Sequence, residues 1–167
     1  MKTKIQWFVC WCLSLIVVGG AVVIFNSEQP LKATVAHGND KFSMVTVPVA
    51  PGDPEAVFVL NHLTGVLRGA AFNNSTNTFT HHFIYNVAAD FQGAIASPEP
   101  KFAIVSTQAS LRSGAGAQPA NGVIYIGELT SGIVIAYGFP MPRGRAAAVP
   151  GGLFRLDAFQ FTESVGG

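Results

Sequence analysis

The sequence predicts an all-β body of two duplicated four-stranded antiparallel units, preceded by one N-terminal transmembrane α-helix. Three observations predict this fold class. An uninterrupted apolar run lies near the N-terminus, short runs rich in Val, Ile, Phe and Tyr fill the rest of the chain, and one order of runs and turns occurs twice. No segment after Phe25 keeps the 3.6-residue period of an amphipathic helix for long, so we expect the body to be nearly all strand.

The composition bounds the size and the partners of the protein. The chain has 167 residues, of which 49% are hydrophobic and 11% charged, enough for one domain with an appended segment. Eight of the ten Lys and Arg residues and all nine Asp and Glu residues follow Asn26, so the body is close to neutral. Nucleic-acid-binding domains carry a basic patch or stripe, and we therefore expect no nucleic-acid partner.

Residues Ile5–Phe25 form the predicted membrane anchor. The run contains no charged side chain, and a helix needs about 20 apolar residues to cross the hydrocarbon core. Lys2 and Lys4 precede it, which by the positive-inside rule keeps the N-terminus in the cytoplasm and places the body outside, in the periplasm or at the cell surface. Trp7 and Trp11 near the cytoplasmic end are typical of an interfacial aromatic belt.

A cleaved signal peptide is the alternative for this segment. Gly19, Gly20 and Ala21 are small residues of the kind that a signal peptidase requires. The apolar run continues beyond them to Phe25, whereas a mature N-terminus is usually polar, and we therefore favour the uncleaved anchor. Both alternatives export the body.

Both cysteines lie inside the predicted anchor. Cys10 and Cys12 are two residues apart, and residues at this spacing do not face each other on a helix. We therefore expect buried thiols rather than a disulfide or a metal site. The rest of the chain has no cysteine, so packing rather than disulfides is expected to stabilise the body.

A linker and a duplicated domain follow the anchor. Residues 26–40 mix polar, Pro and Gly residues without periodicity, which predicts a linker, and 41–167 remain for the β domain. Two repeat units, about 41–93 and 101–163, begin with the similar stretches KFSMVT and KFAIVS. Each unit is expected to run strand, strand, turn, strand, strand.

The central turn of each unit fixes the alignment of the two units. HLTG at 62–65 is aligned with ELTSG at 128–132, which requires one inserted residue, Ser131. Gly65 and Gly132 then occupy equivalent places in short hairpin loops. A loop of this kind needs a positive φ, which glycine reaches without a Cβ penalty. We therefore predict that both are structural turn residues.

Several predicted strands are apolar at every position. AVFVL at 56–60, VIYI at 123–126 and GIVIAY at 132–137 show no alternation with polar residues. Continuous apolar runs are typical of strands that are buried on both faces. We therefore expect the outer faces to be covered by another layer, formed by other subunits in a homo-oligomer or by other envelope proteins. Ile135→Glu is expected to prevent such association.

The stretch VLNHLTGVLRG, which starts at Val59, resembles the turn of a β-propeller blade of the quinoprotein type, with its pattern A-x-D-x-x-T-G-x-x-x-W. Thr64 and Gly65 match this pattern. Asn61 stands at the Asp position and Gly69 at the Trp position. The resemblance implies blade-like hairpins.

In the second unit the same alignment puts Gly127 at the Asp position and Ala136 at the Trp position. We carry over no quinone from the resemblance and expect no cofactor. Two architectures are open for the body, propeller-blade-like units that close a ring between chains or a β-sandwich with two equivalent sheets. The whole chain also resembles small single-span bacterial envelope proteins.

Five side chains are the candidates for a binding site. His62 lies in the first turn, and His81 and His82 are adjacent in a predicted strand, where neighbours point to opposite faces and do not share one metal ion. Because no zinc-type ligand spacing occurs, we expect no metal site. Arg143 and Arg145 are the densest basic pair of the body and are suited to a lipid phosphate or a carboxylate partner.

No catalytic residue is predicted. Asp90 and Asp157 fall in the last strand of each unit, either as paired carboxylates or as local partners of the backbone. No nucleophile and base form a recognisable motif. We therefore expect a membrane-anchored exported structural or assembly protein whose β body oligomerises. An extracytoplasmic module that binds sugar or peptide is the alternative, and an exported enzyme comes third.

Overall fold

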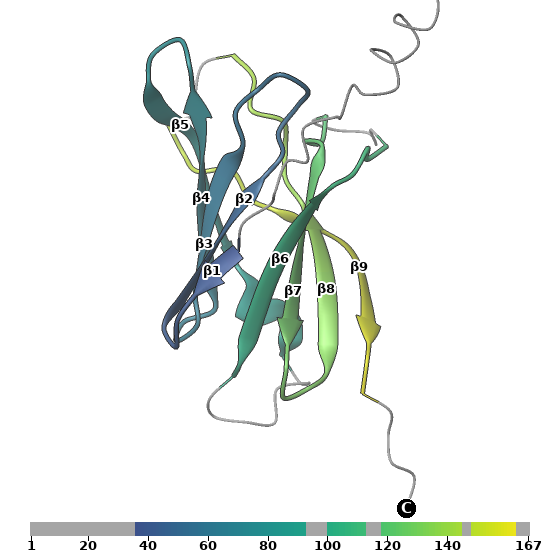
Figure 1. Cartoon of the computed structure of the whole chain (residues 1–167). Helices are drawn as coiled ribbons and strands as arrows, with labels where there is room; N and C mark the ends of the chain where they lie inside the picture. Colours follow the sequence, from purple (N-terminus) through teal and green to yellow (C-terminus); the bar gives the residue numbers. More distant parts are fainter. Residues whose placement is uncertain (1–35, 93–99, 113–117, 145–147, 163–167) are drawn as a thin grey trace, which may run out of the picture. The chain divides into compact units, whose positions relative to one another are not determined.

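Two antiparallel β-sheets make up the part of the chain that the computed structural model describes, which is residues 36–92, 100–112, 118–144 and 148–162 (Figure 1). Sheet 1 has the strand order β1-β2-β3-β4-β5 and sheet 2 the order β6-β7-β8-β9. The strands are β1 (Ala36–Gly38), β2 (Phe42–Val47), β3 (Ala56–Asn61), β4 (Val66–Asn73), β5 (Thr78–Asn86), β6 (Phe102–Gln108), β7 (Gly122–Glu128), β8 (Ile133–Gly138) and β9 (Phe154–Gln160).

These sheets confirm the prediction of an all-β body with two similar antiparallel units. One short 3₁₀ helix, Val87–Phe91, follows β5. Sheet 1 has a fifth strand, because β1 pairs with β2 at its edge. This strand falls within residues 26–40, which the sequence analysis assigns to a linker. The folded body therefore begins before Lys41.

The predicted anchor, Ile5–Phe25, lies outside the described residues. Within the described part of the chain, no helix has the length and apolar character that crossing a membrane requires. Membrane attachment and export therefore stay predictions.

The two glycine turns are confirmed. Residues 62–65 join β3 to β4 and residues 129–132 join β7 to β8. Gly65 has a φ of 64° and Gly132 a φ of 71°. Both values lie in the left-handed region, which a residue with a Cβ enters at a cost.

The backbone corrects the predicted alignment of these turns. The Gly65 amide donates to the Asn61 carbonyl at 2.8 Å, and the Gly132 amide donates to the Glu128 carbonyl at 3.0 Å. Both loops therefore have the same length, and Ser131 is not an insertion. Glu128, rather than Gly127, is the structural equivalent of Asn61.

One core lies between the two sheets. It contains Val45 and Phe58 from sheet 1, and Ile126 and Tyr137 from sheet 2. In Figure 1, β2 lies next to β6, whereas β5 and β9 lie at the opposite margins of the body. The Ser106 hydroxyl on β6 donates to the Thr46 carbonyl on β2 at 2.5 Å. The two sheets therefore approach each other most closely along β2 and β6.

The apolar strands are covered unevenly on their outward sides. In β3 the inward side chains are buried and the outward Val57 and Val59 are half-buried. In β7 every residue is buried except Tyr125, which is half-buried. The expectation for Ile135 was wrong, because its side chain faces the core and is buried. Ile135→Glu would disrupt the fold itself and does not test association.

Candidate functional site

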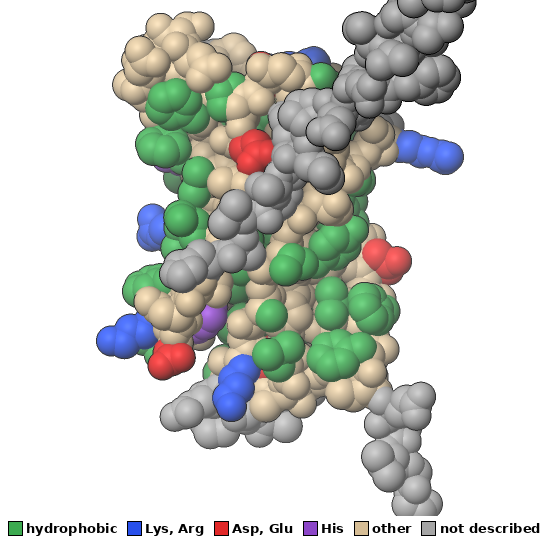
Figure 2. All heavy atoms as spheres, viewed as in Figure 1, with side chains coloured by type: hydrophobic (Ala, Val, Ile, Leu, Met, Phe, Trp, Pro, Cys, Tyr) green, Lys and Arg blue, Asp and Glu red, His purple; other side chains and the backbone are tan. Residues whose placement is uncertain are grey.

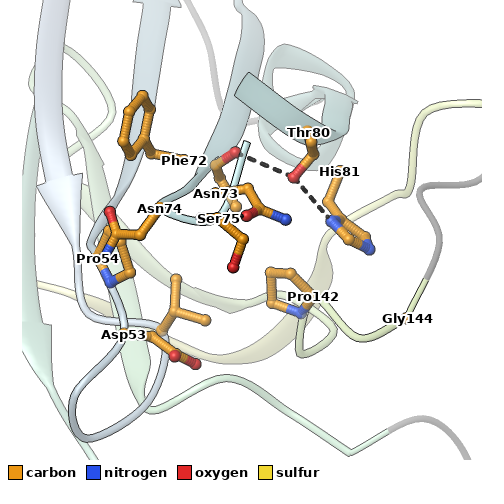
Figure 3. A pocket seen from close by; sticks show the side chains of 12 residues that line it. Asp53, Pro54, Phe72, Asn73, Asn74, Ser75, Thr80, His81, Pro142 and Gly144 are labelled. Carbon is orange, nitrogen blue, oxygen red and sulfur yellow. Dashed lines mark hydrogen bonds between the residues drawn. The ribbon is translucent and has the colours of Figure 1, made fainter. Parts of the chain in front are cut away.

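A polar pocket of about 280 Å³ lies at the end of sheet 1 where β4 turns into β5 (Figure 3). Asn73, Ser75 and Thr80 of this hairpin line it, together with Asp53 from the loop after β2. Pro142 and Gly144, from the segment that follows β8, also line it. Amide, hydroxyl and carboxylate groups therefore surround a space that is large enough for a small polar ligand.

A β-bulge directs His81 into this pocket. Thr80 pairs with Ala71 and His82 pairs with Ala70, which leaves His81 as the extra residue between them. Its φ of 47° is the left-handed value that such an extra residue adopts. The bulge removes the strand alternation on which the sequence analysis based its placement of the two histidines. His81 is half-buried in the pocket, and His82 is exposed.

Both ring nitrogens of His81 have partners. Nδ1 lies 3.1 Å from the Thr80 hydroxyl, and Nε2 lies 3.3 Å from the Arg143 carbonyl oxygen. Because a carbonyl oxygen only accepts, the second hydrogen bond requires the proton on Nε2. The structure thus brings His81 and the backbone of Arg143 together, two of the five predicted candidates. No carboxylate of the described residues is hydrogen-bonded to His81, and the Arg143 carbonyl is the group that fixes the tautomer of its ring.

The other candidates lie elsewhere. His62 is in the β3–β4 turn, at the opposite end of the strands from His81, where its Nε2 is 2.9 Å from the Ser43 hydroxyl. The Arg143 side chain is exposed, and Arg145 lies outside the described residues. The part of the chain that the structure describes contains no group of three His, Cys, Asp or Glu residues able to hold a metal ion.

The two aspartates are not paired. Asp90 accepts hydrogen bonds from the hydroxyls of Tyr85, at 3.0 Å, and Tyr137, at 2.9 Å. Burial, reinforced by the hydrogen bond to Asp90, raises the pKa of both tyrosines. Asp157 instead pairs with Ala136 on the outer face of sheet 2 and accepts from the Ala158 amide at 2.8 Å. Asp90 therefore fastens two side chains of the core.

Glu128 is a buried carboxylate that the sequence analysis missed. It accepts from the Lys101 amide at 3.1 Å, the Ser131 amide at 2.6 Å, and both the amide and the hydroxyl of Thr130. Burial alone would raise its pKa, but these hydrogen bonds outweigh burial and lower the pKa to about 2. Glu128 therefore closes its turn as an anion. The inserted residue in the predicted alignment hid its equivalence to Asn61.

Asn61 performs the same task in the first turn. Its side-chain oxygen accepts from the amides of Leu63, at 2.9 Å, and Thr64, at 3.2 Å. A side chain that accepts from the backbone two and three residues later fixes the conformation of the loop. Asn61 and Glu128 are therefore structural residues of the turns.

Comparisons with protein-family models, with curated proteins and with solved structures found no match to this chain. The resemblance to a quinoprotein-type propeller blade stays a prediction.

Proposed function

We propose that the protein is a membrane-anchored, exported structural protein whose β body assembles with further copies of itself. The observation that carries this proposal is the apolar character of both outer sheet faces. On sheet 1, Phe42 and Met44 are 45% and 46% exposed, and on sheet 2, Val105 and Phe159 are 53% and 61% exposed. Figure 2 shows hydrophobic side chains spread over the visible surface of the β6–β8 region.

Exposed surface of this kind favours association. Burial of apolar surface contributes about 25 cal/mol per Å², and monomeric proteins rarely expose contiguous apolar patches larger than a few hundred Å². On the outer face of sheet 1, Phe42, Val59 and Val66 line a groove of about 390 Å³ in which Arg68 is the one charged residue. A surface with so little charge is better suited to a protein interface than to solvent.

The polar pocket supports an enzyme less well. His81 lacks a hydrogen-bonded carboxylate within the described residues, and the single hydroxyl proton of its neighbour Thr80 is shared between Nδ1 of His81 and the Ala71 carbonyl, which lies 3.5 Å from the hydroxyl oxygen. The pocket therefore lacks the carboxylate that orients the imidazole in a Ser-His-Asp triad, and the Arg143 carbonyl alone holds the Nε2 proton.

Attachment to a membrane is the second part of the proposal. It rests on the uncharged run Ile5–Phe25 and the lysines before it. The cysteine-free body is compatible with an oxidising compartment. In membranes prepared from cells that make the full chain, the protein should resist extraction at alkaline pH. Protease added to the non-cytoplasmic side of the membrane should digest the body. Release at alkaline pH would contradict the anchor.

The test of self-assembly uses the full chain in detergent. Light scattering coupled to size exclusion should give a protein mass that is a multiple of the 17.6 kDa chain. A particle with the mass of one chain, at all concentrations from about 1 to 100 μM, would contradict the proposed function.

The pocket favours a ligand-binding module as the second candidate function. Asn73, Ser75 and Thr80 offer donors and acceptors suited to sugar hydroxyls or peptide amides. Isothermal titration with a panel of oligosaccharides and short peptides should then detect binding that Ser75→Ala weakens. Thr78→Ala, in the same hairpin but outside the pocket lining, is the matched control. Equal binding to both variants would place the ligand elsewhere.

A further inference from the structure

The three central strands of one unit, β2–β4, are equivalent residue by residue to β6–β8 of the other. Phe42 pairs with Asn61 in sheet 1, and Phe102 pairs with Glu128 in sheet 2. Phe42 is thus equivalent to Phe102, and Asn61 to Glu128. Asn61 also pairs with Val66, as Glu128 does with Ile133, so β3 is equivalent to β7 and β4 to β8. Even the bulges lie at similar places, between β4 and β5 and between β8 and β9.

Equivalent residues nevertheless point to opposite sides of the body. Val45 is fully buried between the sheets, whereas its equivalent Val105 is 53% exposed. Phe102 is 5% exposed, whereas its equivalent Phe42 is 45% exposed. We call the side that contains Val45 and Val105 the front face of each sheet and the side that contains Phe42 and Phe102 the back face.

The internal interface is therefore made by unlike faces. The front of sheet 1 packs on the back of sheet 2, which leaves the back of sheet 1 and the front of sheet 2 directed outward. A contact that lies on a two-fold axis brings two identical faces together, whereas a head-to-tail contact brings two different faces together. The internal contact is of the second kind, and the outward faces are its two complementary halves.

At three positions of each outward face, the residue has kept the apolar type of its buried equivalent. On the front, the outward Val105, Tyr125 and Val134 of sheet 2 correspond to the buried Val45, Phe58 and Leu67 of sheet 1. A face that remained in water would gain nothing from these residues.

The back face follows the same rule. The outward Phe42, Val59 and Val66 of sheet 1 correspond to Phe102, Ile126 and Ile133 of sheet 2. Phe102 and Ile126 are buried in the core, and Ile133 packs against it. Both halves of a core-like interface are therefore present on the outside of one chain.

The charges on the two outward faces are complementary. Arg68 pairs with Val59 and is the one Lys, Arg, Asp or Glu on the back of strands β2–β5. Asp157 pairs with Ala136 and is the one such residue on the front of strands β6–β9. Stacking of unlike faces places opposite charges on the two sides of the interface, whereas stacking of like faces places equal charges there.

From these observations we infer that the chains assemble head to tail, with the back of sheet 1 of one chain packed on the front of sheet 2 of the next. The inference rests on the proposed self-assembly and specifies its surfaces. The contact repeats the one inside the chain, including the hydrogen bond along β2 and β6. Since Thr46 is the equivalent of Ser106, the Thr46 hydroxyl of one chain donates to the Ser106 carbonyl of its neighbour.

Repetition of one rotation closes a ring or builds an open filament. Rings of four-stranded blades close with about four to eight blades, which corresponds to about two to four chains with two blades each.

The test blocks one face at a time in the full chain. Met44→Glu places a charge on the back of sheet 1, and Val105→Glu places one on the front of sheet 2. Both side chains are about half exposed, so each variant should keep the fold, which the far-UV circular dichroism spectrum of the full chain checks. Leu63→Glu, at a turn residue that is 75% exposed and on neither face, is the control and should assemble like wild type.

Head-to-tail assembly predicts a distinctive result on mixing. Each blocked variant alone should have the mass of one chain in detergent, because each has lost one half of every contact. An equimolar mixture should form a heterodimer of the two variants, since each retains the half that the other lacks.

Three results would overturn the inference. If Met44→Glu dissociates while Val105→Glu assembles like wild type, identical back faces pair with each other. The converse result would assign the contact to identical front faces. Blocked variants that stay monomeric when mixed at about 100 μM would also contradict it. A wild-type chain that is itself monomeric would instead refute the proposed function.

Discussion

Glu128 has the most unusual environment of the described side chains. It is fully buried, and its hydrogen-bond partners are three amides and one hydroxyl rather than a cation. Burial of a carboxylate is expensive unless hydrogen bonds compensate for the lost water. Two of the three amides, those of Thr130 and Ser131, belong to the loop itself, and the third, that of Lys101, precedes β6. The carboxylate anion therefore stabilises the conformation of this loop, and the amides of the loop stabilise the anion.

This arrangement predicts acid sensitivity. The folded pKa of about 2 lies below the ordinary value of 4.5. The stabilisation is therefore fully present above pH 4.5 and is lost as the pH falls toward 2. Glu128→Gln should reduce the free energy of unfolding by about 2 to 3 kcal/mol at pH 7, and by progressively less at lower pH. Urea unfolding of residues 34–167 measures this free energy, and Asp53→Asn, at an exposed carboxylate, is the control. A difference that is constant between pH 7 and 2 would contradict the assignment.

Asp90 supports a second prediction at the residue scale. It accepts hydrogen bonds from Tyr85 and Tyr137, and Tyr137 is fully buried. Asp90→Ala leaves that hydroxyl without its partner, at a cost of about 1 to 3 kcal/mol. The double variant Asp90→Ala/Tyr137→Phe removes the orphaned hydroxyl as well and should recover part of the loss. Urea unfolding at neutral pH measures the free energy of unfolding of each variant. An Asp90→Ala variant that is as stable as wild type would contradict the hydrogen bond.

At the scale of the elements, the turns were predictable and the strand faces were not. Gly65 and Gly132 each lie in a short loop between two apolar runs, and a glycine at this place predicts a positive φ. The strands of 123–126 and 133–137 are apolar at every position, so the sequence pattern carries no information about which side chains face inward. Ile135 was placed on the wrong side for this reason.

Two further errors have local causes. The identical Leu-Thr pairs of the two turns lie one residue out of register, and matching them created the false insertion at Ser131. The bulge at His81 depends on the pairing of β4 with β5, which no residue type in that stretch indicates. Backbone pairing, and not residue identity, therefore defines the equivalence of the two units.

The first turn supplies a prediction about its glycine. A Cβ on Gly65 would lie 2.4 Å from the Ala88 Cβ, whereas one on Gly144, which has the same φ of 64°, has nothing within 4 Å. Gly144→Val therefore costs only the backbone strain, about 1 kcal/mol or more. Gly65→Val should cost clearly more, because Ala88 must also move. Thermal melting of the two variants measures the difference, and equal losses would place Ala88 away from this turn.

At the scale of the whole molecule, duplication of one unit explains both the stability of the chain and its open faces. A unit with two apolar faces buries one of them against its copy within the chain. The other faces remain uncovered however well the internal pair fits, and because the internal contact joins unlike faces, the stack of two ends in two unlike faces. Packing of the body and assembly of the protein are therefore two uses of one interface.

The charges on the outward faces permit a test that no single-face model predicts. Arg68→Asp places two negative charges across the proposed contact, and Asp157→Arg places two positive ones there, so each change should lower the mass of the detergent-solubilised particle. Arg68→Asp combined with Asp157→Arg restores an opposite pair and should restore the wild-type mass. Because salt screens the repulsion between two like charges, the single variants should recover part of their association at about 0.5 M NaCl. If the double variant assembles no better than either single variant, Arg68 and Asp157 do not face each other across the interface.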